Sequence, residues 1–147
     1  MPKVMIIYYS RTGNTEKMAK AIKEGLHRVP GMEVESKFDT TPEEVMSVDA
    51  VLIGSPTYHH DMAINIKNLL ENTVAKNINM RGKLGACFGS YGWSGEAPKL
   101  VQEIMKTKFE MKVIKPPLQV KYKPNDKDLE ECRQLGENVA KTIAGLA

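Results

Sequence analysis

Apolar strand-forming runs alternate with amphipathic helical patterns along this chain, and the alternation limits the possible folds more than any other feature. The runs at residues 4–9, 50–54 and 84–89 carry no charged side chain, which is typical of parallel strands buried on both faces. Residues 32–38 alternate charged with mostly apolar side chains. That pattern leaves one face in water, so we expect this strand near a sheet edge.

A helical pattern follows each strand. Stripes of apolar residues at intervals of three and four predict helices over residues 62–74, 97–105 and 129–143. A fifth strand is predicted over residues 113–120, broken by Pro116-Pro117. The clearest stripe follows the first strand and consists of Met18, Ala21, Ile22, Gly25, Leu26 and Val29.

Local signals mark where three of the helices begin. Thr41 and Pro42, followed by Glu44, fit an N-cap, a proline at the first helical position and a capping-box glutamate, and they predict a short second helix. Asp61 is placed to cap the third helix. The segment Pro124-Asn125-Asp126 is expected to start the last one.

Strict β-α alternation, repeated five times, predicts an α/β fold. We expect a three-layer α/β/α sandwich with a five-stranded parallel sheet, because right-handed crossovers leave few other topologies. The order 2-1-3-4-5 is preferred, since it puts the amphipathic second strand at an edge. At 147 residues with 41% hydrophobic content, the chain is expected to form a single domain over residues 1–147.

The predicted order brings the carboxyl ends of strands 1, 3 and 4 together at the topological switch point, where such sheets bind ligands. The loop after the first strand, Ser10-Arg11-Thr12-Gly13-Asn14-Thr15, leads into a helix N-terminus. Unpaired N–H groups and the helix dipole favour an anion there, and hydroxyl side chains add donors. This loop therefore predicts a phosphate site. The alternative is a well-capped turn that binds nothing.

The loops after strands 3 and 4 supply aromatic side chains. Tyr58 lies in residues 55–61, and Tyr91 and Trp93 lie in residues 90–95. Exposed aromatic rings beside a phosphate site suit a flat ring system attached to a phosphate. Each aromatic residue taken alone could equally serve loop packing.

The net charge of +3 and pI of about 8.8 are mild, and no basic motif is concentrated on one element, so we expect no nucleic-acid partner. No apolar stretch approaches the roughly 18–20 residues of a membrane span, which predicts a soluble, cytoplasmic protein. Cys87 and Cys132 lack a Cys-x-x-Cys spacing and are expected to be small buried side chains. His59 and His60 project in different directions, so no metal site is expected.

The residues identified so far resemble a flavodoxin. Ser10-x-Thr12-Gly13-Asn14-Thr15 matches the phosphate loop of that family. Residues 54–58, 88–96 and 117–120 are similar to the flavodoxin-like domain at the C-terminal end of flavodiiron proteins, also called A-type flavoproteins. The resemblance covers essentially the whole chain. It implies a flavodoxin-like fold, non-covalently bound FMN and electron transfer between redox partner proteins. The two-iron domain of flavodiiron proteins is not in this sequence, so no oxygen or nitric oxide reduction is expected from it alone.

The resemblance also implies which residues contact FMN. The phosphate loop would hold the phosphate, with Arg11 contributing its backbone, and Trp93 would be the main stacking residue. No protein residue need be catalytic, because the cofactor carries the redox chemistry. The implied cofactor-binding residues are Ser10, Arg11, Thr12, Gly13, Asn14 and Thr15 at the phosphate, Pro56, Thr57, Tyr58 and His59 on one side of the ring, and Ser90, Tyr91, Gly92 and Trp93 on the other.

Free-carrier flavodoxins are typically acidic, whereas this chain is basic. We therefore expect a less negative potential for the formation of fully reduced FMN. The lysines at 112, 115, 121, 123 and 127 could dock an acidic partner or could protect a sheet edge.

Two other functions share the predicted topology. A flavin-dependent reductase acting directly on a quinone or with NAD(P)H is the main alternative, although no nicotinamide-site motif is recognisable. A signalling receiver domain would need acidic residues where this chain has Tyr9-Ser10 and Ser55-Pro56.

Overall fold

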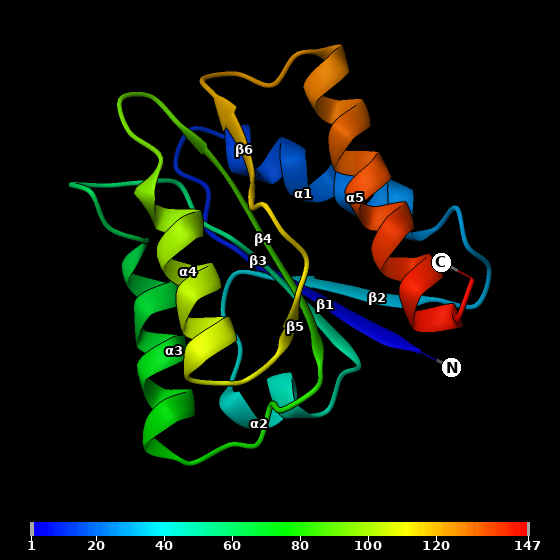
Figure 1. Cartoon of the computed structure of the whole chain (residues 1–147). Coiled ribbons are helices and arrows are strands. Elements are labelled where there is room, and N and C mark those ends of the chain that lie inside the picture. The colour runs from blue at the N-terminus through cyan, green and yellow to red at the C-terminus, as the bar shows by residue number, and fades with distance from the viewer. Residues whose placement is uncertain (1, 147) are drawn as a thin grey trace.

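One parallel sheet organises the computed structural model, which describes residues 2–146 (Figure 1). Its strand order is β2-β1-β3-β4-β5, and β6 also pairs with β4. The predicted order 2-1-3-4-5 is confirmed. Over the described residues the strands are β1 (Lys3–Tyr8), β2 (Glu33–Lys37), β3 (Ala50–Gly54), β4 (Leu84–Tyr91), β5 (Lys112–Val113) and β6 (Leu118–Lys121).

The fifth position of the sheet is split between two short strands. β5 pairs with the start of β4, and β6 pairs with its end, where Phe88 lies opposite Leu118 and Tyr91 opposite Lys121. Pro116 and Pro117 separate them because a proline has no N–H to donate to a ladder. The predicted single strand over residues 113–120 is therefore corrected to two pieces in one place.

Helices cover both faces of the sheet, as a three-layer sandwich requires. α1 and α5 lie on one side, and α3 and α4 lie on the other (Figure 1). In residues 2–146, none of the helices combines the length and the apolar character needed to cross a membrane. The helices are α1 (Asn14–Leu26), α2 (Pro42–Met46), α3 (Ile64–Ala75), α4 (Glu96–Thr107) and α5 (Asp126–Ala144).

Alternate residues of each central strand enter opposite cores. Ile6 and Leu52 pack with α1 and α5, whereas Ile7 and Ile53 pack with α3 and α4. Both sets are at most 3% exposed. The runs at residues 4–9, 50–54 and 84–89 carry no charged side chains because both faces of each strand lie in an apolar core.

Several predicted details of the helices differ from the structure. The N-cap of α3 is Ala63, and Asp61 instead accepts hydrogen bonds from its neighbour Met62 and from Lys67. At α2 the Thr41 side chain accepts from the Glu44 N–H, but the Glu44 carboxylate binds Lys37 and Thr40, so the capping box is only half formed. The box is complete at α5, between Asn125 and Asp128.

Two residues of the predicted stripes are exposed rather than buried. Val74 on α3 is 44% exposed and Leu100 on α4 is 40% exposed. A helix packed against a sheet buries a stripe narrower than its full apolar face. Both side chains therefore lie at the margin of the contact with the sheet.

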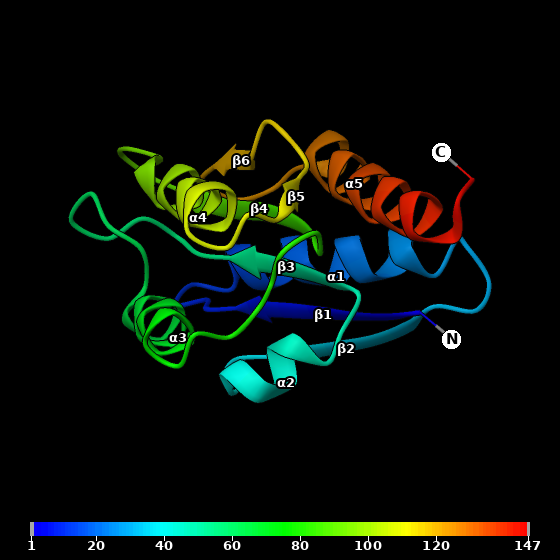
Figure 2. The ribbon, with the colours of Figure 1, turned by 60° about the horizontal axis from the view of Figure 1, so that its bottom comes forward.

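Close packing of α1 against α5 supports the helix that follows the phosphate loop. Figures 1 and 2 show the two helices side by side. A Cβ on Gly25 would overlap the backbone carbonyl of Arg133, and one on Gly136 would overlap that of Ile22. At the rim of this contact, the Arg28 guanidinium binds the carboxylates of Glu130 and Glu137 at 3.1 and 3.2 Å.

We predict that Gly136→Ala lowers the free energy of unfolding by about 1–3 kcal/mol, because the added methyl group forces the helices apart. Alanine normally stabilises a helix interior relative to glycine by about 1 kcal/mol, so the sign is diagnostic. Asn138→Ala, on the exposed face of α5, is the control and should stay within about 0.5 kcal/mol of the parent. Urea unfolding checks both. A more stable Gly136→Ala protein would contradict the close contact.

Candidate functional site

Loops from the carboxyl ends of four parallel strands surround one pocket of about 210 Å³. The pocket lies where the order of the strands reverses between β1 and β3, as predicted. Its walls come from the segments that follow β1, β3, β4 and β6. The lining residues are Ser10, Arg11, Thr12, Asn14, Thr15, Pro56, Thr57, Tyr58, Ser90, Tyr91, Gly92 and Tyr122.

The phosphate loop, residues 10–15, is organised by one hydroxyl group. Ser10 Oγ accepts hydrogen bonds from the backbone N–H groups of Gly13 and Glu16, both at 3.1 Å. Gly13 has φ 90, a left-handed conformation that glycine adopts without the cost it carries for other residues. The serine thus closes the turn while the glycine reverses the chain into α1.

This turn leaves a set of backbone donors free. Within residues 2–146, the N–H groups of Arg11, Thr12, Asn14 and Thr15 donate no hydrogen bond to a protein acceptor. All four residues line the pocket. Four unpaired donors at a helix start form a site for a tetrahedral anion, and each hydrogen bond to a charged oxygen contributes about 1.5–3 kcal/mol.

A buried pair of hydroxyl groups joins the phosphate loop to the end of β4. Thr15 is 1% exposed and Ser90 is 6% exposed. Their Oγ atoms lie 3.1 Å apart, and the Ser90 N–H donates to Thr15 Oγ1 at 3.4 Å. Two neighbouring walls of the pocket are therefore held in register.

The segment after β3 is tied down by side chains as well. Ser55 Oγ donates to the Pro56 carbonyl at 2.9 Å and accepts from the Ala63 N–H at 2.8 Å. Thr57 Oγ1 accepts from the Ala97 N–H at 3.0 Å, within the first turn of α4. Thr57, in the segment after β3, thus supplies the hydrogen-bond acceptor for an N–H group in the first turn of α4.

A tight turn closes the tip of this segment. Tyr58 and Asp61 exchange two backbone hydrogen bonds of 2.8 Å, and the residues between them, His59 and His60, have φ 48 and φ 63. Positive φ at both central residues is the pattern of a type I′ turn, which usually contains asparagine, aspartate or glycine. Two histidines hold this conformation at a cost on the order of 1–2 kcal/mol each.

The turn contacts the loop after β4. His60 Nδ1 lies 3.1 Å from a Glu96 carboxylate oxygen, and its ring centroid lies 5.2 Å from that of Trp93. Hydrogen bonds from Ser94 and His60 lower the pKa of Glu96, which keeps the carboxylate charged. Trp93 is 86% exposed. An aromatic ring in water beside a pocket is available to a ligand or a partner.

Burial raises the pKa of Tyr58, with a smaller contribution in the same direction from Tyr9 and an opposing one from Arg11. The rings of Tyr9 and Tyr58 meet edge to face, with centroids 6.1 Å apart. The wall that Tyr58 forms is therefore neutral at physiological pH. The positive charge of the Arg11 guanidinium acts in the opposite direction to burial and partly offsets this rise in the pKa of Tyr58.

The structure brings most of the predicted site residues together. Of that set, Gly13, His59 and Trp93 do not line the pocket: Gly13 shapes the turn, and the other two are exposed at the loop tips. Sequence reasoning missed Tyr122, which enters the pocket from the segment after β6. No local pattern marks it, because its position depends on the pairing of β6 with β4.

Cys87 and Cys132 are free and buried, as predicted. Burial raises the pKa of the Cys87 thiol, and it raises that of Cys132 to about 12. Reactive cysteines have depressed pKa values. Both thiols therefore contribute to the cores rather than to chemistry.

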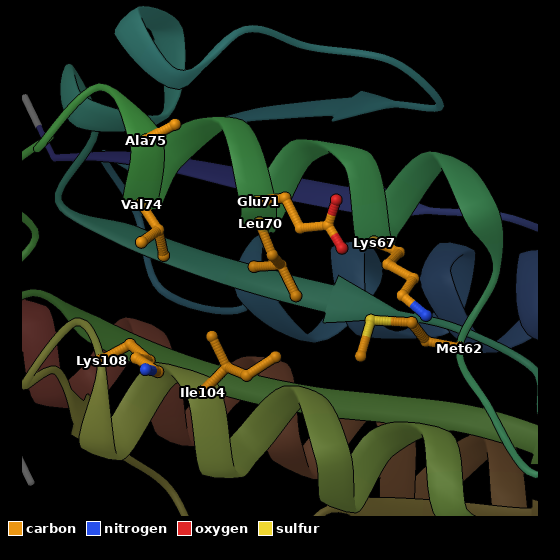
Figure 3. Close-up of a pocket in the computed structure, with 8 residues that line it drawn as sticks. All are labelled: Met62, Lys67, Leu70, Glu71, Val74, Ala75, Ile104 and Lys108. Atoms are coloured by element: carbon orange, nitrogen blue, oxygen red, sulfur yellow. The ribbon is translucent and has the colours of Figure 1, made fainter.

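A larger cavity, of about 360 Å³, lies away from these loops between α3 and α4. Figure 3 shows Leu70 and Val74 of α3 pointing toward Ile104 of α4. Its charged lining side chains are Lys67, Glu71 and Lys108. A phosphate-bearing ligand would find few donors among such aliphatic walls, so the smaller pocket is the better candidate for an anionic cofactor.

Comparison with known proteins agrees with this geometry. Residues 6–136 match the flavodoxin family model. The chain is 37% identical to a type A flavoprotein of Rhodobacter capsulatus over 98% of its own length and 34% of the relative, and 35% identical to a nitric oxide reductase of Moorella thermoacetica over 97% and 36%. It thus spans about a third of these curated relatives. The solved structure of an archaeal flavodoxin superposes with a TM-score of 0.85 at 39% identity, over 97% of this chain and 99% of that one.

We predict that Ser10→Ala weakens binding of inorganic phosphate by about tenfold, because two N–H groups lose the acceptor that orders the turn. It should also lower the free energy of unfolding by about 1–2 kcal/mol. Thr41→Ala removes the comparable acceptor at α2 and serves as the control. It should cost similar stability and leave phosphate binding unchanged. Calorimetric titration and urea unfolding measure the two effects, and equal phosphate affinity in both variants would contradict the role of Ser10.

Proposed function

Because the chain belongs to the flavodoxin family, we propose that it binds FMN without a covalent bond and transfers electrons between redox partner proteins. The observation that carries the proposal is the row of four unpaired N–H groups at the start of α1. Their residues line a pocket whose three other walls each contribute a tyrosine: Tyr58, Tyr91 and Tyr122. A flat ring bearing one phosphate matches both parts of this arrangement.

The residues present fit FMN. The N–H groups of Arg11, Thr12, Asn14 and Thr15 would hold the phosphate. Pro56, Thr57 and Tyr58 would contact one side of the ring, and Ser90, Tyr91 and Gly92 the other. A pocket of about 210 Å³ is small beside the usual range of about 300–1,000 Å³ for ligand sites, so part of the ring would extend past its mouth. His59 and Trp93, at the loop tips, are placed to contact that exposed part.

Bound FMN supplies the capacity to take up and release electrons one or two at a time, so no side chain is needed as an acid, base or nucleophile. The chain's own residues bind and orient. The hydrogen bond between the hydroxyl groups of Thr15 and Ser90, and the one that the Ala97 N–H donates to Thr57, keep the walls in register. The exposed ring edge is where a partner protein would exchange electrons. In the R. capsulatus and M. thermoacetica relatives, this chain matches only a third of the protein, and their whole activities are not part of the proposal.

The visible absorption spectrum of the purified protein tests the proposal directly. We expect a flavin spectrum, release of FMN on denaturation and recovery of the spectrum when FMN is added to the apo-protein. A colourless protein that FMN does not reconstitute would exclude the proposal. Rapid NAD(P)H oxidation by the protein alone would favour the reductase alternative over a carrier.

Positive charge near the ring gives a second prediction. The guanidinium of Arg11 acts on Tyr58, and the chain carries a net charge of +3. Reduction adds negative charge to FMN, so positive surroundings favour the reduced state. We therefore predict that the potential for forming fully reduced FMN is less negative than in acidic flavodoxins.

Arg11→Gln should lower that potential by tens of millivolts, where about 59 mV corresponds to a tenfold change in the relative binding of the two redox states. Arg81→Gln, before β4 at the opposite end of that strand, is the control of equal charge change. Spectroelectrochemical titration of the three proteins measures the shift. An equal effect of both substitutions would show that net charge acts and that Arg11 has no local role.

A further inference from the structure

Tyr122 is held at the pocket by the pairing of β6 with β4. Lys121, the last residue of β6, lies opposite Tyr91 in the parallel ladder. The Tyr122 N–H then donates to the Tyr91 carbonyl at 2.7 Å. Tyr122 is thus fixed beside Tyr91 at the end of β4, and it lines the pocket.

The backbone of Tyr122 adopts a conformation that stability does not explain. Its φ is 61, in the left-handed region, which is a genuine outlier for a bulky residue. The side chain gains little in return, because the residue is 63% exposed. The Lys121 ammonium lies 5.5 Å from the ring centroid. Strain of this kind at a pocket points to function.

The ring lies against the Gly92 backbone. A Cβ placed on Gly92 would meet Tyr122 Cε1 at 3.4 Å and Cδ1 at 3.8 Å. The two positions therefore fit together: Gly92 has no side chain, and the Tyr122 ring occupies the space next to it. The phosphate loop forms another wall of the same pocket.

We propose that Tyr122 retains the cofactor. Its ring would cover the part of the bound FMN that lies next to Gly92 and slow the departure of the molecule. This inference rests on the proposed FMN function. It adds a fourth segment, after β6, to the three loops expected to hold the flavin. Flat aromatic contact with a ligand is worth about 1–3 kcal/mol in comparable stacked sites, which corresponds to roughly five- to 150-fold in affinity.

Three substitutions test the proposal, with apo-protein and FMN as the probe. Tyr122→Ala should speed FMN dissociation at least about fivefold, measured by the recovery of flavin fluorescence. Tyr122→Phe keeps the ring and should stay near the parent rate. Tyr122→Gly should release FMN as fast as Tyr122→Ala, yet unfold at an equal or higher temperature than the parent in the apo form, because glycine adopts this φ without strain.

Phe38→Ala is the matched control, since Phe38 is also exposed and aromatic but packs on Tyr8 beside β2. It should leave the dissociation rate unchanged. If the parent binds FMN and Tyr122→Ala releases it at the parent rate, the role of Tyr122 is overturned and the proposed FMN function stands. If the parent protein itself fails to bind FMN, the proposed function falls and this inference falls with it.

Discussion

Parallel hydrogen bonding between β1, β3 and β4 is the constraint on which the site depends. In a parallel sheet every strand ends at the same edge, so residues distant in sequence meet there. The ladder continues past the strand ends, because the Tyr9 N–H donates to the Gly54 carbonyl and the Ser55 N–H to the Phe88 carbonyl. The loops therefore leave the sheet at set positions. Each is then tied to a neighbour by one short polar side chain.

Most of the fold could be predicted because burial leaves a periodic record in the sequence. Buried strands carry no charge, and helices repeat their apolar residues every three or four positions. The turn at residues 10–15 was predictable for a related reason, since its free donors are backbone groups near a helix start. The helix-cap predictions that were wrong involve carboxylates that have another hydrogen-bond partner in the structure. Asp61 binds Lys67 rather than capping α3, and Glu44 binds Lys37 rather than completing a capping box.

Other parts of the site could not be predicted because no local pattern encodes them. Tyr122 lines the pocket through the register of β6 on β4 and through a positive φ, neither of which a sequence period reveals. The same holds for His59 and His60, whose turn has the backbone of a glycine-rich hairpin without its residues. Trp93 is predicted to stack on the flavin. Its ring lies 5.2 Å from that of His60 and is 86% exposed, so its stacking on the flavin stays a prediction.

The close contact of α1 with α5 at Gly25 and Gly136 links the C-terminal helix to the loop that precedes α1. α1 begins at the phosphate loop, and its C-terminal half, at Ile22 and Gly25, lies directly against the backbone of α5. Local opening of the C-terminal helix would uncover α1 and free the loop it supports. A ligand that binds only the closed form would therefore protect amide protons of α5 against hydrogen exchange. The last helix, which contributes no residue to the lining of the pocket, would thus report its occupancy.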